Sequence, residues 1–416
     1  MPYIGTDSTN YWKGTIITKD GGTMKVEKIY IGGWFQRTML HLSEVYRFLK
    51  DGTSDLALDS RVLQKNRKSL NIKDLVFEVK GFEKIVFNTH DDINVKIYED
   101  GLMVLSKSVI SDDYKQDIEI LKNYYEKSFS SAYSYLFSLG APVPKELANI
   151  KTFFPYFLLF NNAKKETLQS LFQEKGSENY STHSNDNFEV LDDDTYFLIN
   201  SKKGSVPLSR VDRYIEETIF FREFKAQLHR YLNLHRTIWE EVASIKEKTN
   251  VKSKEIDQYA AKVELYYKTM NLVDTRISQM GSYLKTRERI AKDNPDFESF
   301  LGIMNYRYET LNNTMVYIQD VWGMTKNYVV AARELYRGLQ TKITQKLLNN
   351  LTIVSAIGMS AALLGLFQVE GFGFPIWGFI FGGLSVTFGY AAVKFIQFIS
   401  GRGKHKISDK DYEKFK

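Results

Sequence analysis

The sequence predicts an α/β or α+β cytoplasmic domain, followed by long stalk helices and a two-helix transmembrane hairpin. Three observations lead to this fold class. Short segments of alternating polar and apolar residues recur over residues 14–108, as in half-buried strands. After Pro207 the apolar residues recur at three- and four-residue spacing, which is typical of helices. The segment from Leu351 to Val393 contains a single charged residue, Glu370.

The N-terminal region, residues 1–207, is predicted to be a strand-rich domain that senses a ligand. Its six early strands are expected at Gly14–Thr18, Lys25–Ile31, Leu75–Val79, Lys84–Phe87, Asn94–Tyr98 and Met103–Ser108. The later elements are expected, in order, as a helix over Asp112–Leu139, a strand over Phe153–Phe160, a helix over Lys164–Glu174, an exposed loop over Lys175–Asn187 and strand structure over Phe188–Asn200.

Residues 208–346 are predicted to form a helical stalk of three helices. The second and third carry apolar residues in an alternating three-four spacing, which is a coiled-coil seam. The seam of the second helix is explained either by an antiparallel hairpin within one chain or by contact with another chain. For the seam of the third helix we expect oligomerisation. The two seams are Ile256, Tyr259, Val263, Tyr266, Met270, Val273, Ile277, Met280 and Leu284, and then Leu301, Met304, Tyr308, Leu311, Met315, Ile318 and Trp322.

The transmembrane hairpin is predicted over residues 347–399. A span needs about 20 predominantly apolar residues, and residues 347–367 and 374–396 meet that length, with residues 368–373 as an external loop. Gly378 and Gly382 in the second span favour close helix packing. The protein is therefore expected to lie in the lipid bilayer.

Both termini are predicted to be cytoplasmic, in a multi-pass protein of the cytoplasmic (inner) membrane. The N-terminus shows no secretory signal pattern, and basic residues flank both spans, which by the positive-inside rule places the flanks in the cytoplasm. Residues 400–416 form the basic tail. The chain has no cysteine, which excludes disulfides and cysteine-ligated zinc. The net charge of +6 is modest, and no direct contact with nucleic acid is expected.

No enzymatic motif appears, so the protein is not expected to be an enzyme. The phosphate-binding loop, zinc-protease and nucleophile-elbow patterns are all missing. His229 and His235 are six residues apart on a helix and therefore do not form a metal pair. The run Asp192-Asp193-Asp194 is interpreted as an acidic turn between strands rather than a cation site. No ligand or metal residues are assigned.

A polar stripe in the first span is predicted to line a pore. Polar side chains in a bilayer are costly unless they face protein or water, and small hydroxylated residues alternating with apolar ones suit a pore that closes by dewetting. Ordinary helix packing is the alternative interpretation. The predicted pore-lining residues are Gln345, Leu348, Leu351, Thr352, Ser355, Met359, Ala362 and Leu366, with Gln368 and Glu370 at the external mouth.

The layout resembles the CorA divalent cation transporters of the two-transmembrane GxN superfamily. The likeness is architectural over the whole chain and closest from Ala331 to Phe367, where Gly365-Leu366-Phe367 resembles the family's Gly-Ile-Tyr. The family's Gly-Met-Asn signature is replaced by Gln368-Val369-Glu370. The resemblance implies a funnel-shaped homopentamer that conducts a divalent cation such as magnesium, and the replaced signature argues against magnesium selectivity.

Three functions follow as hypotheses. The first is a CorA-like cation channel or transporter that is gated through its cytoplasmic domain. The second is a membrane pore effector of a type III CRISPR antiviral defence system, which a nucleotide second messenger activates in the cytoplasmic domain. The third is a membrane-tethered coiled-coil protein that does not conduct.

Overall fold

The protein was analysed as a computed structural model of the full chain. The structure describes residues 15–17, 23–34, 40–79, 82–109, 114–137, 156–174, 181–184, 188–193, 195–202, 208–248, 250–293 and 301–369, together with 384, 387, 389–391, 394–395 and 404–406. The chain divides into two compact units. Unit 1 comprises residues 1–230 and 276–316, and unit 2 comprises residues 231–275 and 317–416.

Unit 1 is built on a ten-stranded sheet with the order β3-β4-β5-β6-β2-β7-β10-β9-β8, and β1 pairs with β2. Neighbouring strands are antiparallel except β7 and β10, which are parallel. The strands are β1 (Thr15–Ile17), β2 (Thr23–Trp34), β3 (Ile72–Glu78), β4 (Lys84–Thr89), β5 (Ile93–Tyr98), β6 (Leu102–Ser108), β7 (Tyr156–Asn161), β8 (Ser181–Ser184), β9 (Phe188–Asp192) and β10 (Tyr196–Ser201). The six early strands and β7 confirm the predicted strands. The predicted loop over Lys175–Asn187 instead contains β8.

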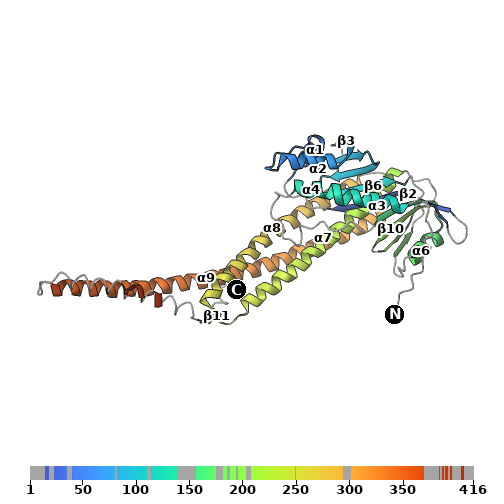
Figure 1. The fold of residues 1–416 in the computed structure, drawn as a ribbon. Coiled ribbons are helices and arrows are strands. Elements are labelled where there is room, and N and C mark those ends of the chain that lie inside the picture. Colours follow the sequence, from blue (N-terminus) through green and yellow to red (C-terminus); the bar gives the residue numbers. More distant parts are fainter. Residues whose placement is uncertain are drawn as a thin grey trace, which may run out of the picture. The chain divides into compact units, whose positions relative to one another are not determined.

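One face of the sheet carries the main apolar core under a layer of short helices (Figure 1). Alternate residues of each strand enter this core; on β5 these are Ile93, Val95 and Ile97, all fully buried. The covering elements are α1 (Leu42–Asp51), α2 (Ser60–Ser69), α3 (Tyr114–Tyr124), the π-helical turn η1 (Tyr125–Phe129), α4 (Ser130–Leu136) and α6 (Lys165–Glu174). The predicted helix over Asp112–Leu139 corresponds to α3, η1 and α4.

The opposite face of the sheet packs against the first part of α7 (Leu208–Lys246). Trp34 of β2 contacts Phe220 and Phe224, with ring centroids 6.5 and 5.2 Å apart. A Cβ atom on Gly32 would lie 2.7 Å from the carbonyl oxygen of Met103 and 3.0 Å from the Ile219 side chain. Glycine is therefore required where α7 approaches β2.

Unit 2 is formed by segments of α7, α8 (Ser253–Lys292) and α9 (Leu301–Val369), with a small β11–β12 pair (Asn250–Lys252 and Lys404–Lys406). Arg333 of α9 binds Glu264 of α8 through two hydrogen bonds of 2.6 and 3.1 Å. The Tyr336 hydroxyl donates to the Ile245 carbonyl of α7 at 2.8 Å. The helices α7, α8 and α9 confirm the three long helices predicted for this region.

Both predicted seams are largely buried within the single chain. In α8, Val263, Val273 and Leu284 are fully buried, which supports the intramolecular interpretation of that seam. In α9, Ile318 and Trp322 are also buried, at 0% and 1% exposure. Helices of the same chain therefore cover the α9 seam, so its burial does not require the expected oligomerisation, which stays a prediction.

Across the part of the chain that the structure describes, no helix is both long and apolar enough to cross a membrane. This finding contradicts the predicted transmembrane hairpin (residues 347–399), the membrane-channel assignment and the localisation in the cytoplasmic membrane. A span needs about 20 predominantly apolar residues. The uncharged part of α9 with described side chains lies within residues 347–359 and includes Asn349 and Asn350. The second predicted span, residues 374–396, lies mostly outside the described residues. The funnel-shaped homopentamer stays a prediction.

Candidate functional site

The predicted pore-lining residues do not converge on a site in the described structure. Those with described side chains lie along α9 and are exposed to solvent, and the Thr352 hydroxyl donates to the Leu348 carbonyl of its own helix at 2.9 Å. The exposed residues are Gln345, Leu348, Leu351, Thr352, Ser355 and Met359. Ala362, Leu366 and Gln368 belong to α9, but their side chains lie outside the described residues, as does Glu370 altogether.

A polar row crosses five neighbouring strands on the face of the sheet that packs against α7. The partners in register are Asp74 on β3, Asn88 on β4, Asn94 on β5, Ser106 on β6 and Tyr30 on β2. Side chains of directly opposed residues are neighbours on one face. Asn88 Nδ2 donates to Asp74 Oδ1 at 2.9 Å, and Asn94 Nδ2 donates to Asn88 Oδ1 at 2.8 Å. The row is thus a continuous polar surface.

A pocket of about 470 Å³ lies over this polar row. Its volume falls within the roughly 300–1,000 Å³ of small-molecule sites. Lysines, amides, hydroxyls and carboxylates line it, from β2 to β6 and from the start of α7. The lining residues are Lys28, Lys73, Asp74, Asn88, Asp92, Asn94, Lys96, Ser106, Ser108 and Asp212.

Two lysines of the sheet are held at this pocket by carboxylates of α7. Lys28 Nζ lies 3.1 and 3.2 Å from the two carboxylate oxygens of Asp212, and Tyr30 also donates to Asp212. Lys96 Nζ donates to Glu216 at 2.7 Å and lies 3.8 Å from Asp212. Asp212 and Glu216 are one helical turn apart and therefore share a face of α7. We name Lys28, Lys96, Asp212, Glu216 and Tyr30 the pocket lysine cluster.

The charges of this cluster stabilise one another against burial. Burial alone raises the pKa of the Glu216 carboxyl, but Lys96 and Arg213 outweigh it, so the pKa is lowered. Burial likewise lowers the pKa of Lys96, but Glu216 outweighs it, so the pKa is raised. Burial and Asp212 raise the pKa of Tyr30. At neutral pH Lys96 is therefore cationic and Tyr30 is a neutral donor.

A second charged cluster of unit 1 is sealed from solvent. Arg287 of α8 lies 2.8 Å from Asp100 in the β5–β6 turn and 2.8 Å from Glu217 of α7, and Tyr308 of α9 donates to Glu217 at 2.8 Å. The side chains of Arg287, Asp100 and Glu217 are at most 1% exposed. The guanidinium also lies 4.4 Å from the Phe220 ring centroid. We name Arg287, Asp100, Glu217 and Tyr308 the buried arginine cluster, and its lack of solvent access gives it a structural role.

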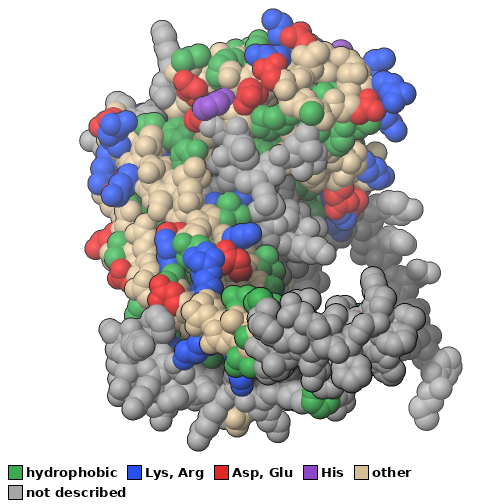
Figure 2. All heavy atoms as spheres, turned by 90° about the vertical axis from the view of Figure 1, so that its left-hand side faces the viewer, with side chains coloured by type: hydrophobic (Ala, Val, Ile, Leu, Met, Phe, Trp, Pro, Cys, Tyr) green, Lys and Arg blue, Asp and Glu red, His purple; other side chains and the backbone are tan. Residues whose placement is uncertain are grey.

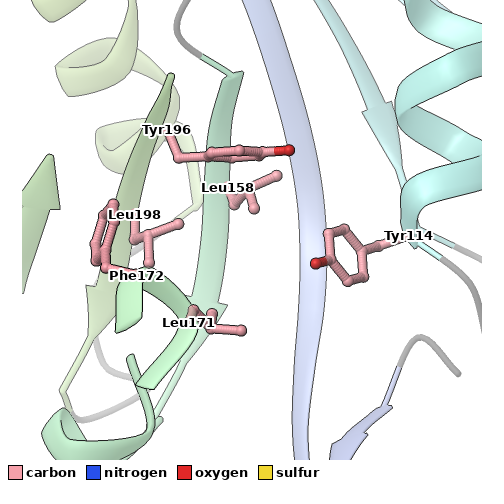
Figure 3. A pocket seen from close by; sticks show the side chains of 6 residues that line it. All are labelled: Tyr114, Leu158, Leu171, Phe172, Tyr196 and Leu198. Carbon is pink, nitrogen blue, oxygen red and sulfur yellow. The ribbon is translucent and has the colours of Figure 1, made fainter. Parts of the chain in front are cut away.

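A small apolar cavity lies on the other face of the sheet, between α6, α3 and strands β7 and β10 (Figure 3). Leu158, Leu171, Phe172 and Leu198 line it together with two tyrosines. Its volume of about 10 Å³ is at the lower limit for one water molecule. This cavity is a packing defect of the core and is too small for a ligand.

The residues considered as metal ligands are not arranged as a metal site. Asp193 Oδ1 accepts hydrogen bonds from the backbone N–H groups of Thr195 and Tyr196, so it stabilises the β9–β10 turn as predicted. His235 packs against Trp322, with ring centroids 6.2 Å apart, whereas His229 is exposed. Among the described residues, no group of three or more metal-ligating side chains forms a candidate metal site.

On the face that Figure 2 shows, acidic and basic side chains of the described residues are interspersed. Nucleic-acid binding relies on clustered lysine and arginine residues. Lys28 and Lys96 differ from such a patch because they lie in a concave polar site beside carboxylates. This arrangement suits a small ligand.

Sequence reasoning missed the pocket, although two signals were present. Strand β5 alternates strictly, with Asn94 and Lys96 on the face opposite Ile93, Val95 and Ile97. Such alternation shows that the second face of the strand is polar, and it does not show what lies over that face. The assignment of Asp212 and Glu216 to the same site required the tertiary structure.

Comparisons with protein-family models and with curated proteins find no match for this chain.

Proposed function

We propose that this protein is a small-molecule sensor in which unit 1 binds a nucleotide at the pocket over the polar row. The protein acts by binding, and no turnover of the ligand is part of the proposal. The observation that carries it is the pocket itself, in which two partly buried lysines stand beside a row of amides and hydroxyls.

The mixture of groups matches the chemistry of a nucleotide. Lys28, Lys73 and Lys96 supply positive charge for phosphate oxygens. Asn88 and Asn94 offer amide groups that both donate and accept, as the edge of a base and ribose hydroxyls require. Acidic residues at the same pocket accept hydrogen bonds from hydroxyl or amino groups. An apolar ligand would leave these groups unpaired, at a cost in affinity.

The proposal keeps one part of the sequence hypotheses, which is a nucleotide signal in the N-terminal region. The cation channel and the membrane pore are not retained, since both need spans that the described residues do not contain. The link to antiviral defence stays a prediction, and so does the resemblance to CorA transporters.

Isothermal titration calorimetry tests the proposal with four probes: ATP, AMP, cyclic di-AMP and inorganic phosphate. We expect at least one nucleotide to bind, and Asn94→Leu to weaken that binding by about tenfold, because it removes one charge-assisted or polar contact at the pocket floor. The matched control is Asn123→Leu, an exposed asparagine on α3 at the other face of the sheet.

The control variant should bind within about twofold of the wild type. Thermal melting of both variants checks that they fold. Failure of every probe to bind the wild type, or equal weakening by both variants, would show that this pocket is not the ligand site.

A further inference from the structure

Asp212 occupies the place where an anionic group of a ligand would sit. Its carboxylate lines the pocket. Lys28 Nζ lies 3.1 Å and Lys96 Nζ 3.8 Å from its oxygens, and the Tyr30 hydroxyl donates a hydrogen bond to it. Three donors from strands β2 and β5 therefore converge on one carboxylate that is supplied by α7.

The two carboxylates of α7 differ in their access to the pocket. The Glu216 side chain is 4% exposed and accepts hydrogen bonds from Lys96 and Tyr98 inside the layer between sheet and helix. The Asp212 side chain is 18% exposed and lies at the pocket wall. A ligand in the pocket can replace Asp212 and leave Glu216 in place.

We propose that Asp212 is a built-in competitor of the ligand: a phosphate group entering the pocket takes over Lys28 and Tyr30, and its binding releases the first turns of α7 from the sheet. This inference rests on the proposed function and gives it a regulatory output. A phosphate offers more acceptor oxygens than a carboxylate to the same donors, so the exchange keeps the lysines neutralised.

The release is local because apolar contacts hold the rest of α7. Val211, Ile215 and Ile219 are buried, and Phe220 packs against Trp34. Before Val211, the described helix extends only to Leu208. Buried Val211 and Tyr214 and the ion pairs of Asp212 together constrain the helix start, so loss of the ion pairs loosens it, while the residues from Ile215 onward remain attached.

Affinity measurements with two matched variants test the competition. Asp212→Asn and Asp92→Asn each remove one acidic charge from the same pocket, so they change its net charge equally, but in the structure only Asp212 is held by Lys28 and Tyr30. With ATP and inorganic phosphate as probes, we expect Asp212→Asn to tighten binding at least fivefold and Asp92→Asn to tighten it less, because Asp92→Asn removes a charge but frees neither Lys28 nor Tyr30. Equal effects of the two variants would overturn the competition.

Hydrogen–deuterium exchange of a peptide covering residues 208–217 tests the release. We expect ATP to increase exchange there in the wild type, and Asp212→Asn to increase it without ATP, whereas Asp92→Asn leaves it unchanged. Unchanged exchange in Asp212→Asn would overturn the release even if ATP binds. If neither probe binds any of the three proteins, the proposed function fails and the competition with it, while the exchange of the ligand-free variants still shows whether Asp212 holds the helix start.

Discussion

The buried arginine cluster and the pocket lysine cluster use the same chemistry in different surroundings. Each joins at least one cation to a carboxylate of α7 and adds a tyrosine hydroxyl. In the first, Arg287 and both carboxylates are almost completely buried, whereas the pocket lysines are 15% and 20% exposed. A buried charge must keep its partners, because no water can replace them. A charge at a pocket can exchange its partner for a ligand.

Two adjacent glutamates of α7 belong to different clusters: Glu216 to the pocket lysine cluster and Glu217 to the buried arginine cluster. Glu217 accepts hydrogen bonds from Arg287 and Tyr308, and Glu216 accepts hydrogen bonds from Lys96 and Tyr98. Adjacent residues of a helix point in different directions, so one helix serves both clusters. The proposed ligand site and the structural cluster are therefore connected through one turn of α7.

The largest effect is expected for Arg287→Met, which leaves Asp100 buried without its cation and Glu217 with only Arg213 at 3.5 Å. We expect a loss of about 3–5 kcal/mol in the free energy of unfolding, measured by urea denaturation. Arg289→Met is the matched control, since Arg289 is exposed two residues further along α8, and it should change stability by less than about 0.5 kcal/mol. A loss below about 1 kcal/mol for Arg287→Met would contradict a structural role for the cluster.

A smaller effect is expected for Glu216→Gln in the pocket lysine cluster. Lys96 loses its closest carboxylate, but Asp212 remains within 3.8 Å and the lysine keeps some solvent access. The free energy of unfolding should fall by about 2 kcal/mol, as for loss of a hydrogen bond to a charged group. Glu240→Gln, an exposed position later on α7, is the control. A loss as large as that of Arg287→Met would remove the difference between the two clusters.

The smallest effect concerns pH. The pKa of Glu216 is lowered in the folded protein from 4.5, so its stabilising contribution is complete above pH 4.5 and is lost as the pH falls through the folded value. The pKa of Lys96 is raised from 10.5, so its contribution is complete below pH 10.5 and is lost as the pH rises further. The stability difference between the wild type and Glu216→Gln should therefore shrink below pH 4.5. A difference that stays constant through the acidic range would mean that Glu216 does not ionise against Lys96.

Most elements of unit 1 were predictable, but α1 and α2 were missed. The signals for α1 were present: His41 N–H donates to Glu44 at its start, and Gly52, with φ of 67°, ends it. Buried Leu42, Val45 and Leu49 follow helical spacing. The short length of this segment made its periodicity less evident than that of the long helices.

The error at the C-terminal end has a different origin. Low charge from Leu351 onward was interpreted as two membrane spans, whereas among the described residues no helix is long and apolar enough to cross a membrane. The stripe from Gln345 to Met359 shares one helix, as its spacing requires, but nothing in the described structure faces it. Spacing on one helix shows which residues share a face, and it does not show what that face contacts.

The sequence by itself determined the local elements: the alternating strands, the three long helices and the acidic turn at Asp193. These depend on periodicity and turn chemistry over a few residues. Only the tertiary structure decided that the polar residues of five strands align in one row and that Asp212 lies against Lys28, 184 positions earlier. Strand order, register and helix placement depend on the packing of distant segments, and the proposed ligand site exists only where those segments meet.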